Sequence, residues 1–158
     1  MEYLLLKWVH IIGASVLFGT GAGIAFFMLM AHRTHDVRVI AHTATIVVIA
    51  DTVFTATAAI LQPITGVMLI GYAGWEFSEG WIVLSILLYV FIGVFWLPVV
   101  WIQIRLRDIA HLTVQQKADL PDEYHRLFRI WFYAGFPAFI AIVALIWLMV
   151  AKPEIALI

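Results

Sequence analysis

A histidine lies in the first apolar segment of the chain, where little else is polar. His10 belongs to the stretch KWVHIIGASVLFGTGAG, residues 7–23. On a helix its face continues through Gly13 and Ala14, which leave room beside the imidazole. A nitrogen ligand next to bare backbone is what a flat macrocycle such as haem requires. His10 is therefore a candidate axial ligand to haem iron. The alternative is an imidazole that is hydrogen-bonded to another helix.

A carboxylic acid lies near the middle of the second apolar segment. Asp51 is followed by Thr52, Thr55 and Thr57, which are possible hydrogen-bond donors. An ionised carboxylate in hydrocarbon is costly unless it is paired, and no basic residue is expected at this depth. We therefore expect Asp51 to act in a proton relay or to lie next to the propionate groups of a bound ligand. A neutral acid bonded to a facing helix is the alternative.

Three further polar side chains are expected at about the depth of His10. Gln62 and Thr65 lie later in the second apolar segment, and Tyr89 lies in the third. They would either line one pocket with His10 or form ordinary hydrogen bonds between helices. No histidine, lysine or cysteine is expected at this depth in the later segments, so the nearest candidate for a second axial ligand is Met68.

The remaining histidines fall near the loops that carry most of the basic residues. They are His32, His35, His42, His111 and His125. His35 and His42 share a face if the second helix begins early. Clustered imidazoles can bind a divalent metal, whereas solvated side chains at the membrane surface are the alternative.

Composition decides which solvent surrounds these residues. Of the 158 residues, 65% are hydrophobic and 12% are charged, against about 25% charged in a typical soluble domain. The chain has no cysteine, which excludes disulfides, thiolate metal sites and covalently attached haem. The net charge of -1 gives no reason to expect a nucleic-acid partner. The sequence is typical of a protein that lies in a lipid bilayer.

Four apolar stretches are long enough to cross a bilayer, which takes about 20 residues. They are residues 3–31, 39–72, 81–104 and 128–151. Because the apolar runs are continuous, they favour helices over barrel strands. The segment 105–129 is compatible with helix on both sides of Pro121, and therefore extends the third and fourth helices. We expect an all-α membrane protein, with one domain over residues 1–158 that forms a four-helix transmembrane bundle.

Basic residues are concentrated in two of the three loops. They are Arg33, Arg38, Arg105, Arg107, Lys117, Arg126 and Arg129. The positive-inside rule places both loops in the cytoplasm and both termini outside, so helices three and four extend into the cytoplasm of a bacterial inner membrane. Aromatic residues are expected at the two surfaces: Tyr3, Trp8, Tyr72, Trp75 and Trp81 outside, and Trp101, Tyr124, Trp131 and Tyr133 inside.

Four long segments together resemble a known family. They are HIIGASVLFGTG, ADTVFTATAAILQPITGVML, FWLPVVWIQIRLR and RIWFYAGFPAFIAIVALIWLMVAKP. These segments cover nearly the whole chain and resemble an uncharacterised bacterial family of predicted four-helix integral membrane proteins. That resemblance implies the fold but no activity.

The chain is also distantly similar to the HemJ-type protoporphyrinogen oxidases, small membrane proteins that bind haem b. The similarity lies in Lys7 and His10 of the first helix, in Arg129, and in the VAKP stretch at 150–153, with a looser match at Pro63, Thr65 and Gly66. Those enzymes have a lysine just after a tryptophan in the third helix, whereas here Trp81 is followed by Ile82, Val83, Leu84 and Ser85. The resemblance thus implies haem bound through His10, without implying the oxidase activity.

Three functions are consistent with these residues. The first is a b-type haem protein, a cytochrome for electron transfer or for a redox reaction on a quinone or porphyrin. The second is a small helical subunit of a larger membrane complex, without enzymatic activity. The third is a proton or cation transporter that uses Asp51.

Gly19 and Gly23 permit close helix approach, either within one bundle or in a homodimer.

Overall fold

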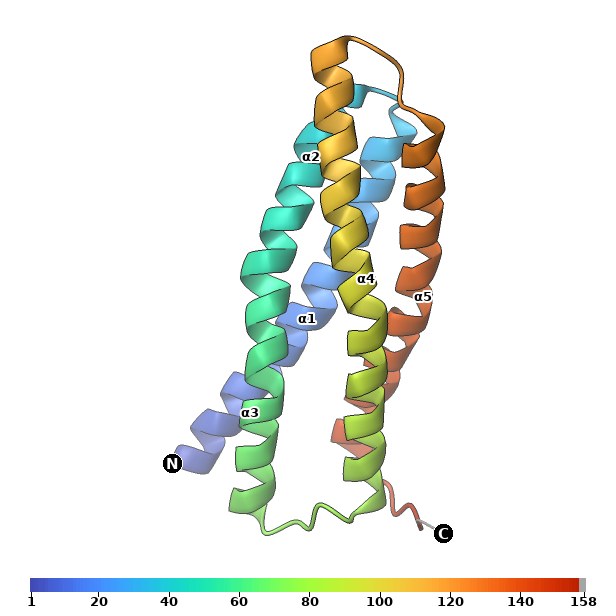
Figure 1. Ribbon diagram of the computed structural model, residues 1–158. Coiled ribbons are helices and arrows are strands. Elements are labelled where there is room, and N and C mark those ends of the chain that lie inside the picture. Colours follow the sequence, from blue (N-terminus) through green and yellow to red (C-terminus); the bar gives the residue numbers. More distant parts are fainter. Residues whose placement is uncertain (157–158) are drawn as a thin grey trace.

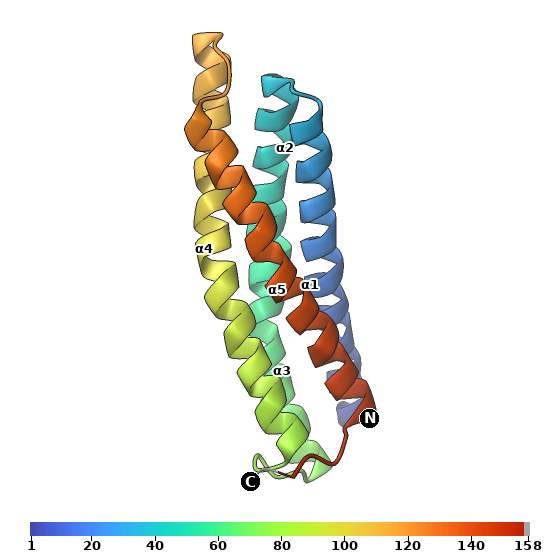
Figure 2. The ribbon, with the colours of Figure 1, turned by 90° about the vertical axis from the view of Figure 1, so that its right-hand side faces the viewer.

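The computed structural model describes residues 1–156 as a bundle of long helices (Figures 1 and 2). In chain order the elements are α1 (Glu2–Arg33), α2 (Val37–Ala50), the π-helical turn η1 (Asp51–Thr55), α3 (Ala56–Ala73), α4 (Gly80–Gln116) and α5 (Asp122–Ala151). Because α2, η1 and α3 run on without a break, the described chain has 4 helices long and apolar enough to cross a membrane. The predicted four-helix bundle is confirmed.

Residues next to the turns explain where several of the helices begin and end. The Asp36 carboxylate caps α2 by accepting hydrogen bonds from the amides of Arg38 at 2.8 Å and Val39 at 3.4 Å. α3 ends at Gly74, whose φ of 70° is left-handed and suits glycine. α4 continues past the apolar stretch to Gln116, and α5 begins directly after Pro121. The segment between the third and fourth spans is therefore mostly helical.

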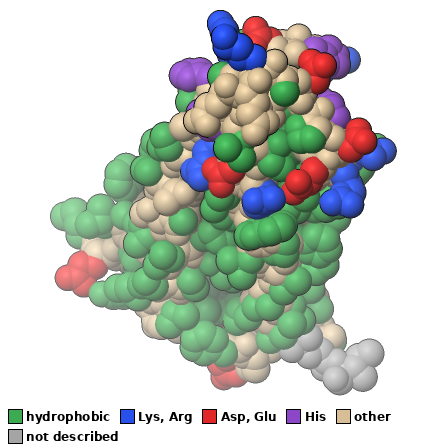
Figure 3. All heavy atoms as spheres, turned by 45° about the horizontal axis from the view of Figure 1, so that its top comes forward, with side chains coloured by type: hydrophobic (Ala, Val, Ile, Leu, Met, Phe, Trp, Pro, Cys, Tyr) green, Lys and Arg blue, Asp and Glu red, His purple; other side chains and the backbone are tan. Residues whose placement is uncertain are grey.

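One end of the bundle carries most of the charge, and we call it the basic end. It is formed by the turns at 34–36 and 117–121, where charged and histidine side chains gather while apolar side chains cover the flanks (Figure 3). The largest buried apolar cluster lies in the half of the bundle next to this end. It contains Ile24, Met28, Ala31, Ile40, Ala41, Ala44, Val47, Ile102, Leu106, Ile109, Ala110, Tyr124, Leu127, Phe128 and Trp131.

The other half of the bundle is held differently. There α1 packs against α3, the Tyr89 hydroxyl of α4 reaches the Ala59 carbonyl of α3, and the first turns of α1 run outward past α3 (Figure 1). Several buried side chains of this half are polar, among them Gln62, Thr65 and Ser85. Gly19 and Gly21 lie on an open surface, since a Cβ at either would meet no atom of the described residues within 4 Å. Hydrogen bonds between helices therefore contribute to the packing of this half.

The described part of the C-terminal tail folds back over the loop between α3 and α4. Lys152 Nζ lies 4.0 Å from the ring centroid of Trp75, which meets Trp81 edge to face at 5.0 Å. A Cβ at Gly80 would lie 2.2 Å from the carbonyl oxygen of Ile155, so only glycine fits under the tail. These contacts close the end of the bundle opposite the basic end.

Three aromatic residues expected at the membrane surfaces are buried instead. Trp81, Tyr124 and Trp131 are 6%, 0% and 4% exposed. Trp81 is covered by the loop and tail, and the other two belong to the core at the basic end. Run length and composition do not distinguish an aromatic ring that anchors a helix in the interface from one that packs against a neighbouring helix.

Leu106→Ala tests the core at the basic end. Leu106 is 1% exposed, so truncation leaves a cavity and should lower the free energy of unfolding by about 2–4 kcal/mol. Leu97→Ala on the same helix is the matched control. Leu97 is 65% exposed, and its truncation should cost less than about 1 kcal/mol. Unfolding in detergent measures both, and equal losses would contradict the position of the core.

Candidate functional site

His10 is hydrogen-bonded to the neighbouring helix α3. Its Nδ1 lies 2.7 Å from the hydroxyl oxygen of Thr65, and that hydroxyl in turn donates to the carbonyl of Leu61 at 2.8 Å. With the threonine proton on that carbonyl, the Thr65 oxygen accepts from Nδ1–H of His10; with the proton turned to the imidazole, Thr65 donates to Nδ1 instead. In the first arrangement the lone pair lies on Nε2, which has no hydrogen bond to the described residues. That first tautomer is the one that a metal-binding histidine uses.

A second hydrogen bond fixes the backbone at the same place. Gln62 Nε2 donates to the carbonyl of His10 at 2.8 Å. The amide occupies the space beside Gly13, where a Cβ would come within 2.4 Å of Gln62 Nε2. The room that the sequence suggested for a ligand beside Gly13 is therefore filled by Gln62. Any ring bound to His10 would have to approach from its Nε2 side.

The other residues expected near His10 lie in different positions. A Cβ on Gly66 would lie 3.5 Å from His10 Cε1, so the imidazole rests close to the α3 backbone. Ala14 is half-buried on α1, one turn further along. The Tyr89 hydroxyl donates to the carbonyl of Ala59, which joins α4 to α3. Met68 is 48% exposed on the surface of α3, where it is unsuited to be a second ligand.

Asp51 is the centre of a separate polar cluster that joins three helices. Trp96 Nε1 on α4 donates to Asp51 Oδ1 at 3.3 Å. With its amide nitrogen turned toward the carboxyl, Gln103 donates to Asp51 Oδ2 at 3.1 Å, and its oxygen accepts from Trp131 Nε1 at 3.2 Å. Asp51, Gln103 and Trp131 are 4%, 5% and 4% exposed. We call these residues, together with Thr55, the Asp51 cluster.

Of the three threonines near Asp51, only Thr55 faces the carboxyl. It is 7% exposed and approaches Asp51, but its hydroxyl has no partner with hydrogen-bond geometry among the described residues. Thr52 is exposed and donates to its own backbone at Val48, 2.8 Å away. Thr57 is exposed as well. The cluster therefore contains one hydroxyl that is free to rotate.

Histidines also gather at the basic end. The His32 ring stacks on Phe128 with centroids 3.8 Å apart, and the rings of His125 and His35 lie 5.8 and 6.4 Å from it. Within residues 1–156, no three histidine or acidic side chains are placed to hold a metal ion. His35 lies in the turn before α2, which begins at Val37, so His35 and His42 do not share a helix face.

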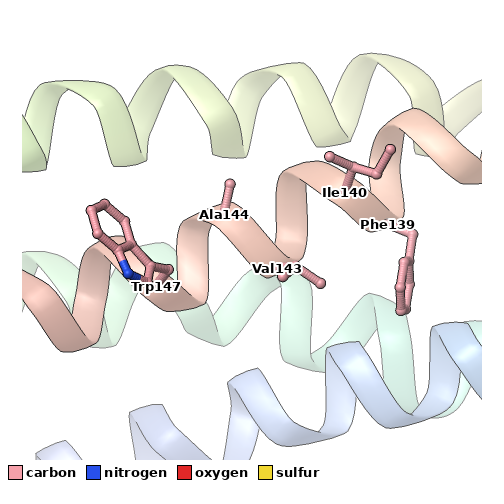
Figure 4. Close-up of a pocket in the computed structure, with 5 residues that line it drawn as sticks. All are labelled: Phe139, Ile140, Val143, Ala144 and Trp147. Carbon is pink, nitrogen blue, oxygen red and sulfur yellow. The ribbon is translucent and has the colours of Figure 1, made fainter.

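The hollows on the bundle surface are shallow, open and apolar. One lies along α5 and is lined by Phe139, Ile140, Val143, Ala144 and Trp147 (Figure 4). A second lies between α1 and the helix that contains η1 and α3, and it is lined by residues such as Ile12, Gly13 and Val53. His10 and Asp51 line neither, so the polar chemistry of the bundle and its surface hollows are in different places.

Comparison with known families assigns the chain. A family model described as "Predicted integral membrane protein (DUF2269)" matches residues 4–153. The chain belongs to this family. The description agrees with the four membrane-spanning helices, and the resemblance to a family of predicted four-helix membrane proteins is confirmed. No curated protein and no solved structure matches the chain, so the similarity to HemJ-type enzymes stays a prediction.

Gly13→Ala tests the contact between α1 and α3. The added methyl would displace the Gln62 amide from the His10 carbonyl, so we expect a loss of about 1 kcal/mol in the free energy of unfolding. Gly19→Ala is the matched control on the same helix, because its methyl meets no described atom within 4 Å. Thermal unfolding in detergent compares the two variants. Equal stability would show that Gln62 does not hold α1 to α3.

Proposed function

We propose that the chain is a b-type haem protein of the bacterial inner membrane, with His10 Nε2 as an axial ligand to the iron. The observation that supports this proposal is the hydrogen bond from His10 Nδ1 to Thr65. Histidines that bind metals characteristically donate their second ring nitrogen to an acceptor, which fixes both the tautomer and the ring orientation. Thr65 is placed to be that acceptor when its own proton is donated to the Leu61 carbonyl.

The contacts around His10 suit its proposed role as an axial ligand. Gly66 lets the imidazole lie against α3, and Gln62 fixes the carbonyl of His10 itself. The histidine is thus held at both its ring and its backbone, as a precise ligand must be. Met68 points to the surface, so we propose that His10 is the only axial ligand that residues 1–156 supply.

A haem held in this way would supply one-electron chemistry, and its partner in the bilayer would be a hydrophobic substrate such as a quinone or porphyrin. This chain's contribution is to orient the imidazole through Thr65 and to keep the ring in an apolar bundle. The basic end is then the cytoplasmic end, which follows from the excess of arginine and lysine there.

His10→Ala should abolish haem binding. The full chain, purified in detergent from haem-replete cells, is expected to show a Soret band that His10→Ala lacks. Thr65→Val keeps the ligand but removes its hydrogen-bond acceptor, and should weaken haem binding by about 10-fold or more. Thr57→Val, at an exposed position on the same helix, should bind haem like the parent protein.

Two results would overturn the proposal. One is a colourless protein from haem-replete cells, and the other is a Soret band that His10→Ala leaves unchanged. If a colourless chain also co-purifies with a larger membrane complex in fixed ratio, the small-subunit hypothesis takes its place. Size-exclusion chromatography of each variant separates loss of haem from loss of folding.

A further inference from the structure

In the Asp51 cluster, the Asp51 carboxyl has a neighbouring hydrogen-bonding group for its protonated state and others for its ionised state. We propose that Asp51 is a proton-exchange site in the interior of the membrane domain. Its ligand is a proton, which Asp51 binds and releases while the bundle stays intact. The proposal does not require a haem at His10.

Two uncharged hydrogen-bond donors on α4 stabilise the deprotonated state of Asp51. The two carboxylate oxygens face different N–H groups, from Trp96 at 3.3 Å and from Gln103 at 3.1 Å. Gln103 is held in the donating orientation because its amide oxygen accepts from Trp131 on α5. Hydrogen bonds to a charged acceptor are stronger than those between neutral groups, and they offset part of the cost of a charge in hydrocarbon.

The protonated state needs an acceptor for its own O–H, and Thr55 supplies one. Its hydroxyl is more than nine-tenths buried, lies against Asp51 and has no hydrogen-bond partner among the described residues. A hydroxyl both donates and accepts, and its proton rotates to suit. After a rotation of its side chain, Thr55 can accept from the neutral acid or donate to the carboxylate. An unpartnered buried hydroxyl is otherwise costly, and this role explains its position.

A proton fits this site better than a metal ion does. A metal ion would need the oxygen lone pairs toward which Trp96 and Gln103 already direct N–H groups, and those protons would repel it. No counter-charge holds the carboxylate either. The ion pairs of residues 1–156 are Arg105 with Glu123 and Arg107 with Asp108, and the side chains that contact the Asp51 carboxyl are an indole, an amide and a hydroxyl.

Infrared difference spectroscopy of the full chain in liposomes, between acidic and alkaline pH, tests the proposal. A protonated carboxyl has a C=O stretch that the carboxylate lacks. The chain has 10 Asp and Glu residues, so several such bands grow as the pH falls, and we expect one of them to be absent in Asp51→Asn. In Thr55→Val, the band should move in wavenumber and its titration midpoint should shift, because the carboxyl loses the hydroxyl that lies beside it.

Thr52→Val is the matched control. It removes a hydroxyl three residues nearer the start of the same turn, but that hydroxyl bonds only to its own backbone. Its spectrum should equal that of the parent protein. The proposal is overturned if Asp51→Asn keeps every titrating carboxyl band, or if Thr55→Val and Thr52→Val give the same band and midpoint. Should Asp51→Asn fail to fold, the comparison of the two threonine variants decides.

Discussion

Hydrocarbon offers no hydrogen-bond partners, and this constraint determines where the polar side chains of the bundle lie. Most hydroxyls on the helices satisfy it locally by donating to a carbonyl one turn back, as Ser15 and Thr113 do. The groups too long or too polar for that solution reach a neighbouring helix instead. His10 and Gln62 pair α1 with α3, and the Asp51 cluster joins the helix formed by α2, η1 and α3 to α4 and α5.

The two halves of the bundle therefore depend on different forces. Next to the basic end, large side chains such as Met28 and Phe128 interlock, and dispersion between well-packed atoms holds the helices. In the other half the contacts between helices include the Gln62 amide, the Thr65 hydroxyl and the half-buried His10 imidazole. Specific polar contacts require defined partners, so these hydrogen bonds fix the orientation of α1 against α3.

Run length and charge were enough to predict the four spans, because a bilayer imposes a length on every helix that crosses it. Pro121 predicted the start of α5, because a proline is not accommodated in the interior of a helix but is tolerated at its beginning. The pairing of His10 with Thr65 was among the interpretations that residue depth allowed. The cluster around Asp51 was missed: Gln103 is a polar residue late in the third span and Trp131 was assigned to the membrane surface. Only the relative rotation and offset of three helices brings them together, and a single sequence does not contain those quantities.

The π-helical turn at Asp51–Thr55 determines how α3 is rotated about its axis relative to α2. There the amide of Ala56 bonds to the carbonyl of Asp51, five residues back, so the turn holds one residue more than an α-helical turn. If these five residues took regular α geometry with none deleted, the whole of α3 would rotate by about 100° relative to α2. Gln62 and Thr65 would then face away from α1 while Asp51 kept its surroundings. The extra residue of this turn thus lets Asp51 face α4 while Gln62 and Thr65, on the same membrane span, face α1.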